Sequence, residues 1–241
     1  YFHSFGDTGQ GCWAAGFQHF WLRGQREGLA ADYGEYCLEL KTAEQHKFNL
    51  LSDTRLNYAY HLDAGLYAKF LRGVAEKHGA VRVEGKIDQV VTRSSDGYIE
   101  ALQLSDGQRV TGDLFIDCTG FKGMLIEQTL QAGYDDWSDF LPCNRAVALQ
   151  TDATESPRPY TRAIAHDFGW QWRIPLQHRT GNGIVFCDRY VSEDEATATL
   201  LANVEGAHRT DPRLIKFTTG QRQKYWLKNC VAATSMSPVA A

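Results

Sequence analysis

The sequence lacks an excess of charge of one sign and any long apolar run. It has 25 Lys and Arg against 29 Asp and Glu, all scattered, so no electrostatic footprint for nucleic acid or an anionic membrane is present. Its longest apolar stretches, Ala146 to Leu149 and Gly183 to Cys187, are far shorter than the roughly 18 residues of a membrane span. No signal-peptide pattern opens the chain. These absences predict a soluble, cytoplasmic protein with neither a nucleic acid nor a membrane as partner.

Paired cysteines are also lacking. The chain has six cysteines, widely spaced and without a CxxC pair: Cys12, Cys37, Cys118, Cys143, Cys187 and Cys230. This spacing predicts neither a zinc site nor a redox dithiol. Reduced, mostly buried thiols are the favoured interpretation, with disulfide pairs of a secreted protein as the alternative.

What is present is enough apolar material for a core, at 43% hydrophobic and 12% aromatic residues in 241. The first fifty residues show no sustained period and predict a loop-rich segment with short helices. From Asn57 to His78 an apolar residue recurs every four positions, which predicts a helix that ends before Gly79. The stripe consists of Tyr58, Leu62, Leu66, Phe70 and Val74.

The middle of the chain is rich in β-formers. Strands are predicted at Val81–Val83, Ile87–Thr92, Tyr98–Leu104 and Leu114–Cys118. Two Asp-Gly turns, at Gly97 and Gly107, make this a small antiparallel meander attached to a buried strand.

A larger sheet is predicted beyond the meander. Its strands are Arg145–Thr151, Arg162–His166, Trp170–Pro175 and Gly183–Arg189, with last strands at Arg213–Phe217 and Trp226–Ala232. Ser192 and Glu195 form a capping-box pattern that starts a helix running through Asn203.

One strand runs directly into an Asp-x-Thr-Gly turn, made by Asp117, Thr119 and Gly120. Such a turn brings backbone close to a bound dinucleotide, because a side chain larger than glycine at position 120 would hold the chain away. A strand that ends in Thr-Gly fits an ordinary tight turn equally well.

The order of helix, meander and strand is the order found in two-domain FAD monooxygenases. Four segments then resemble flavin-dependent tryptophan halogenases, and the resemblance covers nearly the whole chain: Tyr60–Tyr67, Phe115–Gly123, Trp137–Leu149 and Ile174–Gly183. It implies an α/β (mixed α+β) FAD-monooxygenase-like fold with an incomplete dinucleotide-binding part and a large substrate-side sheet.

The resemblance also implies a division of the chain. Residues 1–80 would be a loop-rich substrate-side segment with the long helix, and 81–135 an FAD-binding portion. Residues 136–225 would form the substrate-side sheet, and 226–241 a truncated return to the FAD-binding portion.

The most specific run is Gly169–Pro175, which matches the WxWxIP signature of these halogenases through Trp170, Trp172, Ile174 and Pro175. Two Trp at i and i+2 on a strand point to the same face and together can wall off a cavity. An arbitrary W-x-W more often fills a core. The family resemblance implies that the pair keeps organic substrate away from the flavin, so that halide is oxidised instead.

Further residues take roles by resemblance. The segment from Tyr1 to Gly6 is similar to the family's HPFG segment, so His3 and Phe5 are candidates to hold an indole between them, although Ser4 stands where the family has Pro. Ile87 stands where the family reads FAD with backbone groups. Asp117, Thr119 and Gly120 are the other predicted cofactor-binding residues.

The family's phosphate-binding GxGxxG and its catalytic lysine would precede Tyr1, and its catalytic Glu would follow Ala241. Residues 234–241 also depart from the family pattern. No catalytic residue is therefore predicted within this sequence, and the chain by itself is expected to be an inactive partial chain.

The implied reaction is halogenation of tryptophan or another indole by chloride or bromide, with dioxygen and with reduced FAD supplied by a separate flavin reductase. An FAD-dependent aromatic hydroxylase of the same fold is one alternative, which the WxWxIP run disfavours. A catalytically inactive partial gene product is the other. The carbon attacked and the preferred halide stay open.

Overall fold

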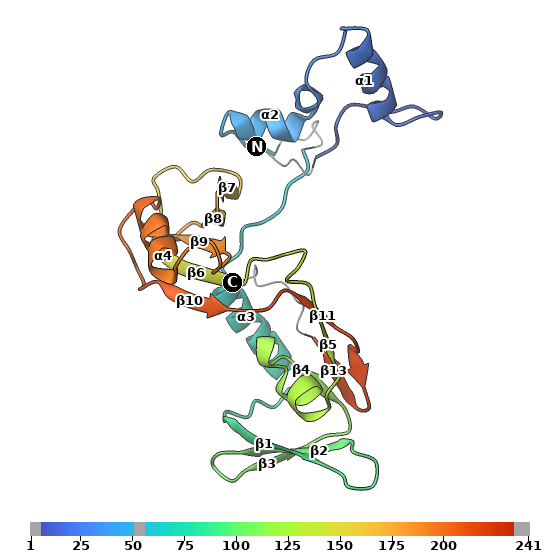
Figure 1. The fold of residues 1–241 in the computed structure, drawn as a ribbon, viewed down its shortest axis with the longest axis vertical. Coiled ribbons are helices and arrows are strands. Elements are labelled where there is room, and N and C mark those ends of the chain that lie inside the picture. The colour runs from blue at the N-terminus through green and yellow to red at the C-terminus, as the bar shows by residue number, and fades with distance from the viewer. Residues whose placement is uncertain (1–5, 51–55, 234–241) are drawn as a thin grey trace.

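The computed structural model describes residues 6–50 and 56–233. Figure 1 shows α1 and α2 at one end, a larger sheet covered by α4 in the middle, and a small three-stranded meander at the other end. Helix α3 runs from the larger sheet toward the meander (Figure 1). His3, Phe5 and the divergent segment 234–241 lie outside the described residues.

The helical elements are α1 Phe17–Arg26, η1 Tyr33–Tyr36, α2 Leu38–Glu44, α3 Ala64–Lys77, η2 Gly120–Lys122, the π-helix η3 Met124–Thr129 and α4 Glu193–Ala202. The first three are short, in keeping with the loop-rich segment expected in the first part of the chain.

Helix α3 begins later than the periodicity predicts, at Ala64 instead of Asn57. The side chain of Asp63 accepts a hydrogen bond from the backbone N–H of Leu66 at 3.0 Å and so caps the helix. The apolar period upstream of Asp63 belongs to an extended segment. Among the described helices, none is long and apolar enough to cross a membrane.

The strands form four sheets. Their bounds are β1 Ile87–Thr92, β2 Ile99–Leu104, β3 Arg109–Thr111, β4 Phe115–Asp117, β5 Tyr134–Asp136, β6 Arg145–Asp152, β7 Arg162–His166, β8 Gly169–Pro175, β9 Arg179–Phe186, β10 Arg213–Lys216, β11 Gly220–Arg222, β12 Trp226–Leu227 and β13 Cys230–Ala232. The predicted strand at Val81–Val83 is absent, and β3 was not predicted.

The larger sheet is antiparallel, in the order β10-β6-β9-β8-β7. Each of its faces carries a core. On one face Val147, Ile184 and Phe186 pack with Leu200 of α4, whose predicted capping box is confirmed. On the other face Trp172 packs with a separate cluster of side chains, Ala146, Val185 and Phe217.

The meander β1-β2-β3 is antiparallel, as predicted, and both turn glycines have positive φ, 69° at Gly97 and 89° at Gly107. Strand β4 instead pairs with β13 in parallel. The two sheets share a core that includes Ile99, Phe115 and Cys230.

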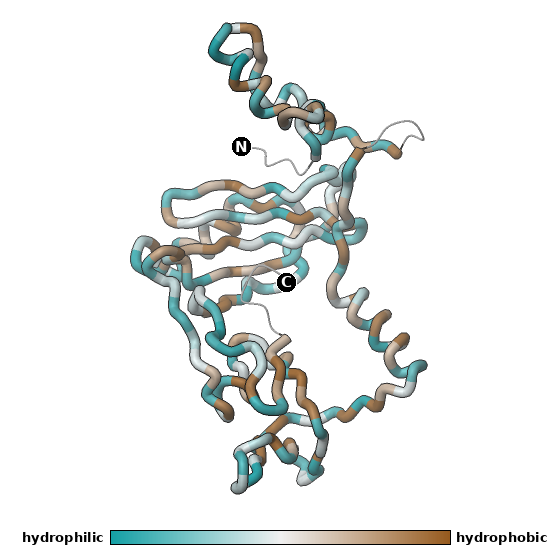
Figure 2. The backbone as a smooth tube through the Cα atoms, turned by 90° about the vertical axis from the view of Figure 1, so that its right-hand side faces the viewer, coloured by the Kyte–Doolittle hydropathy of each residue, from teal (hydrophilic) through white to brown (hydrophobic). Residues whose placement is uncertain are grey.

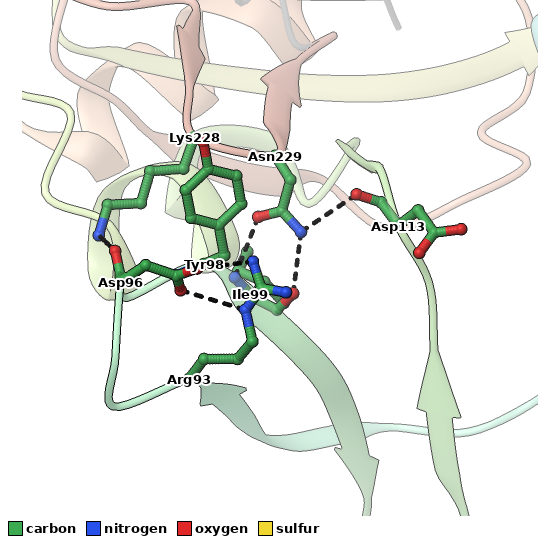
Figure 3. Close-up of polar contacts among 7 residues, drawn as sticks. All are labelled: Arg93, Asp96, Tyr98, Ile99, Asp113, Lys228 and Asn229. Atoms are coloured by element: carbon green, nitrogen blue, oxygen red, sulfur yellow. Dashed lines mark hydrogen bonds and ion pairs between the residues drawn. The ribbon is translucent and has the colours of Figure 1, made fainter.

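Figure 3 shows how the turn before β13 fastens the meander to the parallel pair. Asn229 accepts a hydrogen bond from Ile99 N at 3.0 Å and donates to Ile99 O at 2.8 Å and Asp113 O at 3.2 Å. Lys228 has a φ of 55° and donates from Nζ to Asp96 O at 2.7 Å. The expected single strand Trp226–Ala232 is therefore wrong: it is a hairpin that bends at Lys228.

Helix α3 differs from α4 in that none of its residues is buried. Its apolar residues Leu66, Phe70 and Leu71 are 61%, 65% and 44% exposed. Figure 2 shows hydrophobic positions along α3, which stands apart from the larger sheet. The amphipathic period correctly predicts a helix here, although the helix starts later than expected, and the apolar residues of the helix stay largely exposed.

Candidate functional site

Trp170 and Trp172 project from β8 on the same face of the larger sheet. Their ring centroids are 6.0 Å apart and the rings are tilted by 54°. Trp172 is only 7% exposed and lies in a core with Val185 and Phe217, against which Trp170 and Ile174 also pack. The run WxWxIP therefore places one buried and one half-buried indole side by side.

A glycine on the neighbouring strand makes room for Trp172. Gly183 of β9 lies directly opposite Trp172 in the antiparallel register. A Cβ at Gly183 would overlap the six-membered ring of Trp172. The buried position of this indole thus depends on a missing side chain one strand away.

Trp170 lines a large cavity at the edge of the sheet, with a volume of about 1160 Å³. One wall is a row of rings: Phe48 and Tyr58 lie 5.6 Å apart, and Tyr58 and Tyr60 lie 5.7 Å apart, both in edge-to-face geometry. Tyr160 lines the same space. Edge-to-face aromatic walls suit a planar aromatic ligand, because they fix the plane of a ring inserted among them.

The segment that carries this aromatic row is fastened to the end of β8. His61 donates from Nδ1 to the carbonyl oxygen of Pro175 at 2.9 Å, and its Nε2 lies 3.2 Å from Thr161 Oγ1. Pro175 of the signature thus holds a cavity wall through its backbone.

Two residues further, Asp63 joins helix α3 to the sheet. It receives hydrogen bonds from Leu66 N and from Arg179 Nε at 2.9 Å, and His178 Nε2 lies 3.1 Å away. The hydrogen bond from Leu66, followed by that from Arg179, lowers the pKa of Asp63 to about 2. The carboxylate is therefore ionised at neutral pH.

The predicted Asp-x-Thr-Gly turn follows β4. Asp117 is 1% exposed and accepts hydrogen bonds from Thr119 N and Oγ1 at 2.9 and 2.7 Å and from Leu125 N and Ile126 N, both at 2.9 Å. Burial alone would raise the pKa of Asp117, but these hydrogen bonds lower it below its usual value. Thr119 Oγ1 also accepts from Met124 N at 2.7 Å. Both polar side chains are thus used inside the turn.

Gly120 presents the open backbone of this turn. Its φ is 70°, it is exposed, and no atom lies within 4 Å of the place where a Cβ would stand. It follows the carboxyl end of β4, which runs parallel to β13, and dinucleotides bind at the carboxyl ends of parallel strands. The open backbone at Gly120 fits a cofactor such as FAD that approaches the chain closely.

Ile87, the other predicted cofactor contact, begins β1. Its side chain packs against the core that contains Phe115 of β4, as expected of a strand hydrophobe. Strand β1 is the edge of its sheet, so one row of its backbone groups is not paired with β2. Ile87 and the Gly120 turn therefore border the same core.

An aromatic contact connects the cofactor turn to the tryptophan pair. Phe121, next to Gly120, stacks on Phe217 with ring centroids 6.3 Å apart and planes inclined by 27°. Phe217 belongs to the core of Trp172, which in turn neighbours Trp170. Phe121 thus contacts Phe217, which shares a core with Trp172, and Trp170 packs against that core and lines the aromatic cavity.

The described part of the chain begins at Gly6, beside this cavity. A Cβ at Gly6 would overlap the side chain of Glu39, which lines the cavity. His3 and Phe5 precede Gly6 and lie outside the described residues. Their role in substrate binding stays a prediction.

The architecture is that of flavin-dependent halogenases. The structure aligns with Xcc4156 from Xanthomonas campestris at 53% identity and a TM-score of 0.90, covering 95% of this chain and 47% of that one. It aligns with BrvH from Brevundimonas sp. BAL3 at 42% identity and a TM-score of 0.91, covering 98% and 51%. Both are flavin-dependent halogenases.

The sequence places the chain within one family of such enzymes. The family model for tryptophan halogenase matches residues 1–238, and the chain belongs to that family. Tryptophan 6-halogenase ThaL of Streptomyces albogriseolus is 35% identical over 224 residues, which are 89% of this chain and 42% of the relative. Tryptophan 7-halogenase RebH of Lentzea aerocolonigenes is 34% identical over 228 residues, or 91% and 43%. The chain thus spans less than half the length of these curated relatives.

Several residues of the site were not found from the sequence. Gly183 and Phe217 lie apart from the tryptophan pair in sequence. Phe121 is linked to the site only by its ring contact with Phe217. The glycine inside a strand was an available signal, because such a glycine often marks close packing. The alternating aromatics Tyr58 and Tyr60 were assigned to a helix, which hid their common face.

Proposed function

We propose that this chain contributes the flavin-side turn and the substrate cavity of an FAD-dependent halogenase that acts on tryptophan or another indole. The observation that carries the proposal is the series of aromatic residues in and around one core: Phe121, next to Gly120, contacts Phe217 of that core, and Trp170, which packs against the same core, lines the cavity. Bound FAD would supply the oxygen chemistry, with dioxygen and chloride or bromide as co-substrates.

In this proposal each described residue has a separate task. Gly120 lets the chain approach the cofactor, while Asp117 and Thr119 hold the turn in shape. Ile87 offers backbone groups on the edge strand. Trp172 is the buried part of the barrier between cofactor and cavity, and Trp170 is the part that meets the substrate.

The proposal retains the wider features implied by the family. Reduced FAD would come from a separate reductase by diffusion in the cytoplasm, and the catalytic lysine and glutamate would stand outside this sequence. Residues 81–135 and 226–241 would form the FAD-binding part, and 136–225 the substrate-side sheet. An aromatic hydroxylase is disfavoured because it must admit its organic substrate to the flavin, whereas the WxWxIP tryptophans would separate the two.

An alkylation footprint tests the cofactor turn without requiring turnover. Cys118 is exposed and lies between Asp117 and Thr119, whereas Cys12 is exposed in another part of the chain. We expect FAD to slow alkylation of Cys118 at least several-fold and to leave Cys12 unchanged, as read by peptide mass spectrometry.

Cys230 gives an internal control, because burial, and then the charge of Asp117, raise its pKa to about 11. It should react slowly with or without FAD. If Cys118 reacts at the same rate at saturating FAD, and flavin fluorescence is not quenched, the assignment of this turn to FAD is wrong.

A further inference from the structure

A second, smaller pocket adjoins the aromatic cavity and has a different character. Its volume is about 160 Å³, below the roughly 300–1,000 Å³ of sites for drug-sized ligands. It is lined by Arg158, Arg162 and Arg173, by one acidic residue, Glu205, and by hydroxyl-bearing residues. The hydroxyl-bearing residues are Thr154, Ser156, Tyr160 and Thr180. A space of this size suits a single small polar group.

The three guanidinium groups differ in how far ion pairs and hydrogen bonds within the protein already satisfy them. Arg173 is 11% exposed, pairs with Glu205 through Nη1 and donates from Nη2 to the carbonyl oxygen of Asn203. Arg162 lies opposite Arg173 in the β7–β8 register, and its Nη1 is 4.0 Å from Glu205. Arg158 donates to Tyr160 Oη at 3.0 Å, which leaves its charge unneutralised by that contact. Three positive charges thus face one carboxylate.

The pocket also contains a buried hydroxyl that lacks a partner in the described structure. Thr180 is 4% exposed, and its Oγ1 makes no hydrogen bond there. Arg173 Nε is likewise buried without a partner. Buried polar atoms are normally satisfied, so these groups indicate a hydrogen-bonding ligand. Arginine and hydroxyl donors together select oxyanions, since guanidinium groups match carboxylate and phosphate geometry.

We propose that Arg158, Arg162 and Thr180 form an oxyanion-binding site, for a carboxylate or a phosphate, beside the aromatic cavity. Arg158, Tyr160 and Arg162 line both spaces. The oxyanion therefore belongs to a ligand whose aromatic part occupies the cavity, and this second statement rests on the proposed indole substrate. Anion binding itself does not depend on that substrate.

Binding of inorganic phosphate to this chain tests the anion site directly, by calorimetry at low ionic strength. We expect the variant with both Arg158→Gln and Arg162→Gln to bind at least tenfold more weakly, and Thr180→Val several-fold more weakly. Arg213→Gln, on the exposed edge strand β10 at the opposite side of the sheet, is the matched control and should bind as the parent does.

Circular dichroism melting shows whether the variants fold. If the arginine variants do not fold, the near-isosteric Thr180→Val still tests the site. Absence of phosphate binding by the parent chain overturns the site. Equal binding by the parent and by a folded variant of the pocket overturns it as well.

A second arm asks whether the oxyanion is attached to the aromatic ligand. Indole-3-propionate should displace phosphate and bind more tightly than indole, and Thr180→Val, which alters only the smaller pocket, should reduce that advantage while leaving indole binding unchanged. If phosphate binds and indole-3-propionate neither displaces it nor exceeds indole, the attachment is refuted. Failure of the FAD footprint alongside intact phosphate binding would refute the proposed halogenase role and leave the anion site standing.

Discussion

The five-stranded sheet and helix α3 follow equally clear sequence patterns but are stabilised in different ways. The sheet buries side chains on both faces, and α4 seals one of them with Ala196 and Leu200. Helix α3 buries no residue, and it is held to the sheet by polar contacts at its first turn. An amphipathic pattern therefore specifies a helix without specifying that the apolar face is covered.

This comparison matters for the site, because its parts come from both kinds of region. The tryptophan pair stands on the well-packed sheet, whereas Tyr58 and Tyr60 belong to the extended segment that leads into α3. We expect the sheet side of the cavity to be rigid and the other wall to depend on His61 and Asp63.

A matched pair of leucine substitutions tests the difference most strongly. Leu200 is 0% exposed and Leu66 is 61% exposed. Leu200→Ala should lower the free energy of unfolding by about 2–5 kcal/mol, because it leaves a cavity in a core. Leu66→Ala should change it by less than about 0.5 kcal/mol. Urea unfolding measures both, and equal losses would show that α3 is packed after all.

Asn229 should give the next largest effect, since it fastens the meander to the parallel pair. Asn229→Ala leaves the buried N–H of Ile99 unsatisfied, together with carbonyl groups that Asn229 contacts. We expect a loss of about 2–3 kcal/mol, from the cost of leaving buried polar groups unpaired. Lys228→Ala, which removes an exposed contact at the same turn, should cost much less in the same urea titration. Similar losses for both variants would argue against this account.

The two helix caps offer a smaller, matched comparison. Ser192→Ala removes the capping box of α4 and should lower global stability by about 1 kcal/mol. Asp63→Ala should instead lower the hydrogen-exchange protection of α3 amides and leave the larger sheet unchanged, because α3 is not buried. Loss of protection throughout the sheet in Asp63→Ala would contradict this separation.

The same cap predicts the smallest effect, which depends on pH. The folded pKa of Asp63 is about 2, below the roughly 3.9 of an unfolded aspartate. Its contribution to stability is therefore complete above about pH 4 and is lost as the pH falls through about 2. The protection factors of α3 amides, which correct for the intrinsic effect of pH on exchange, should decrease as the pH falls between these values in the parent chain and stay constant in Asp63→Ala.

Local signals in the sequence predicted much of the fold. The Ser192 and Glu195 box, the Asp-Gly turns of the meander and the β-forming segments of the sheet are all signals that act over a few residues, and the structure has each of them. The family resemblance also identified the run from Trp170 to Pro175, now on β8.

What could not be predicted depends on distant contacts. The bend at Lys228 precedes Asn229, whose side chain is hydrogen-bonded to Ile99, 130 positions earlier. The start of α3 is set by Asp63, whose carboxylate is also held by Arg179, 116 positions away. The pocket of arginines forms only when β7 pairs with β8. Sequence periodicity gives no information about such contacts between distant residues.

The close fit between Trp172 and Gly183 has a consequence for how the protein can change over evolutionary time. Since any side chain at position 183 would collide with the indole opposite it, the two positions cannot vary independently. A larger residue on β9 would require a smaller one on β8, which would change the core that Trp172 shares with Phe217. We therefore expect positions 172 and 183 to covary among descendants of this chain. A change in the residue at position 183 would have to accompany a change in the shape of this core.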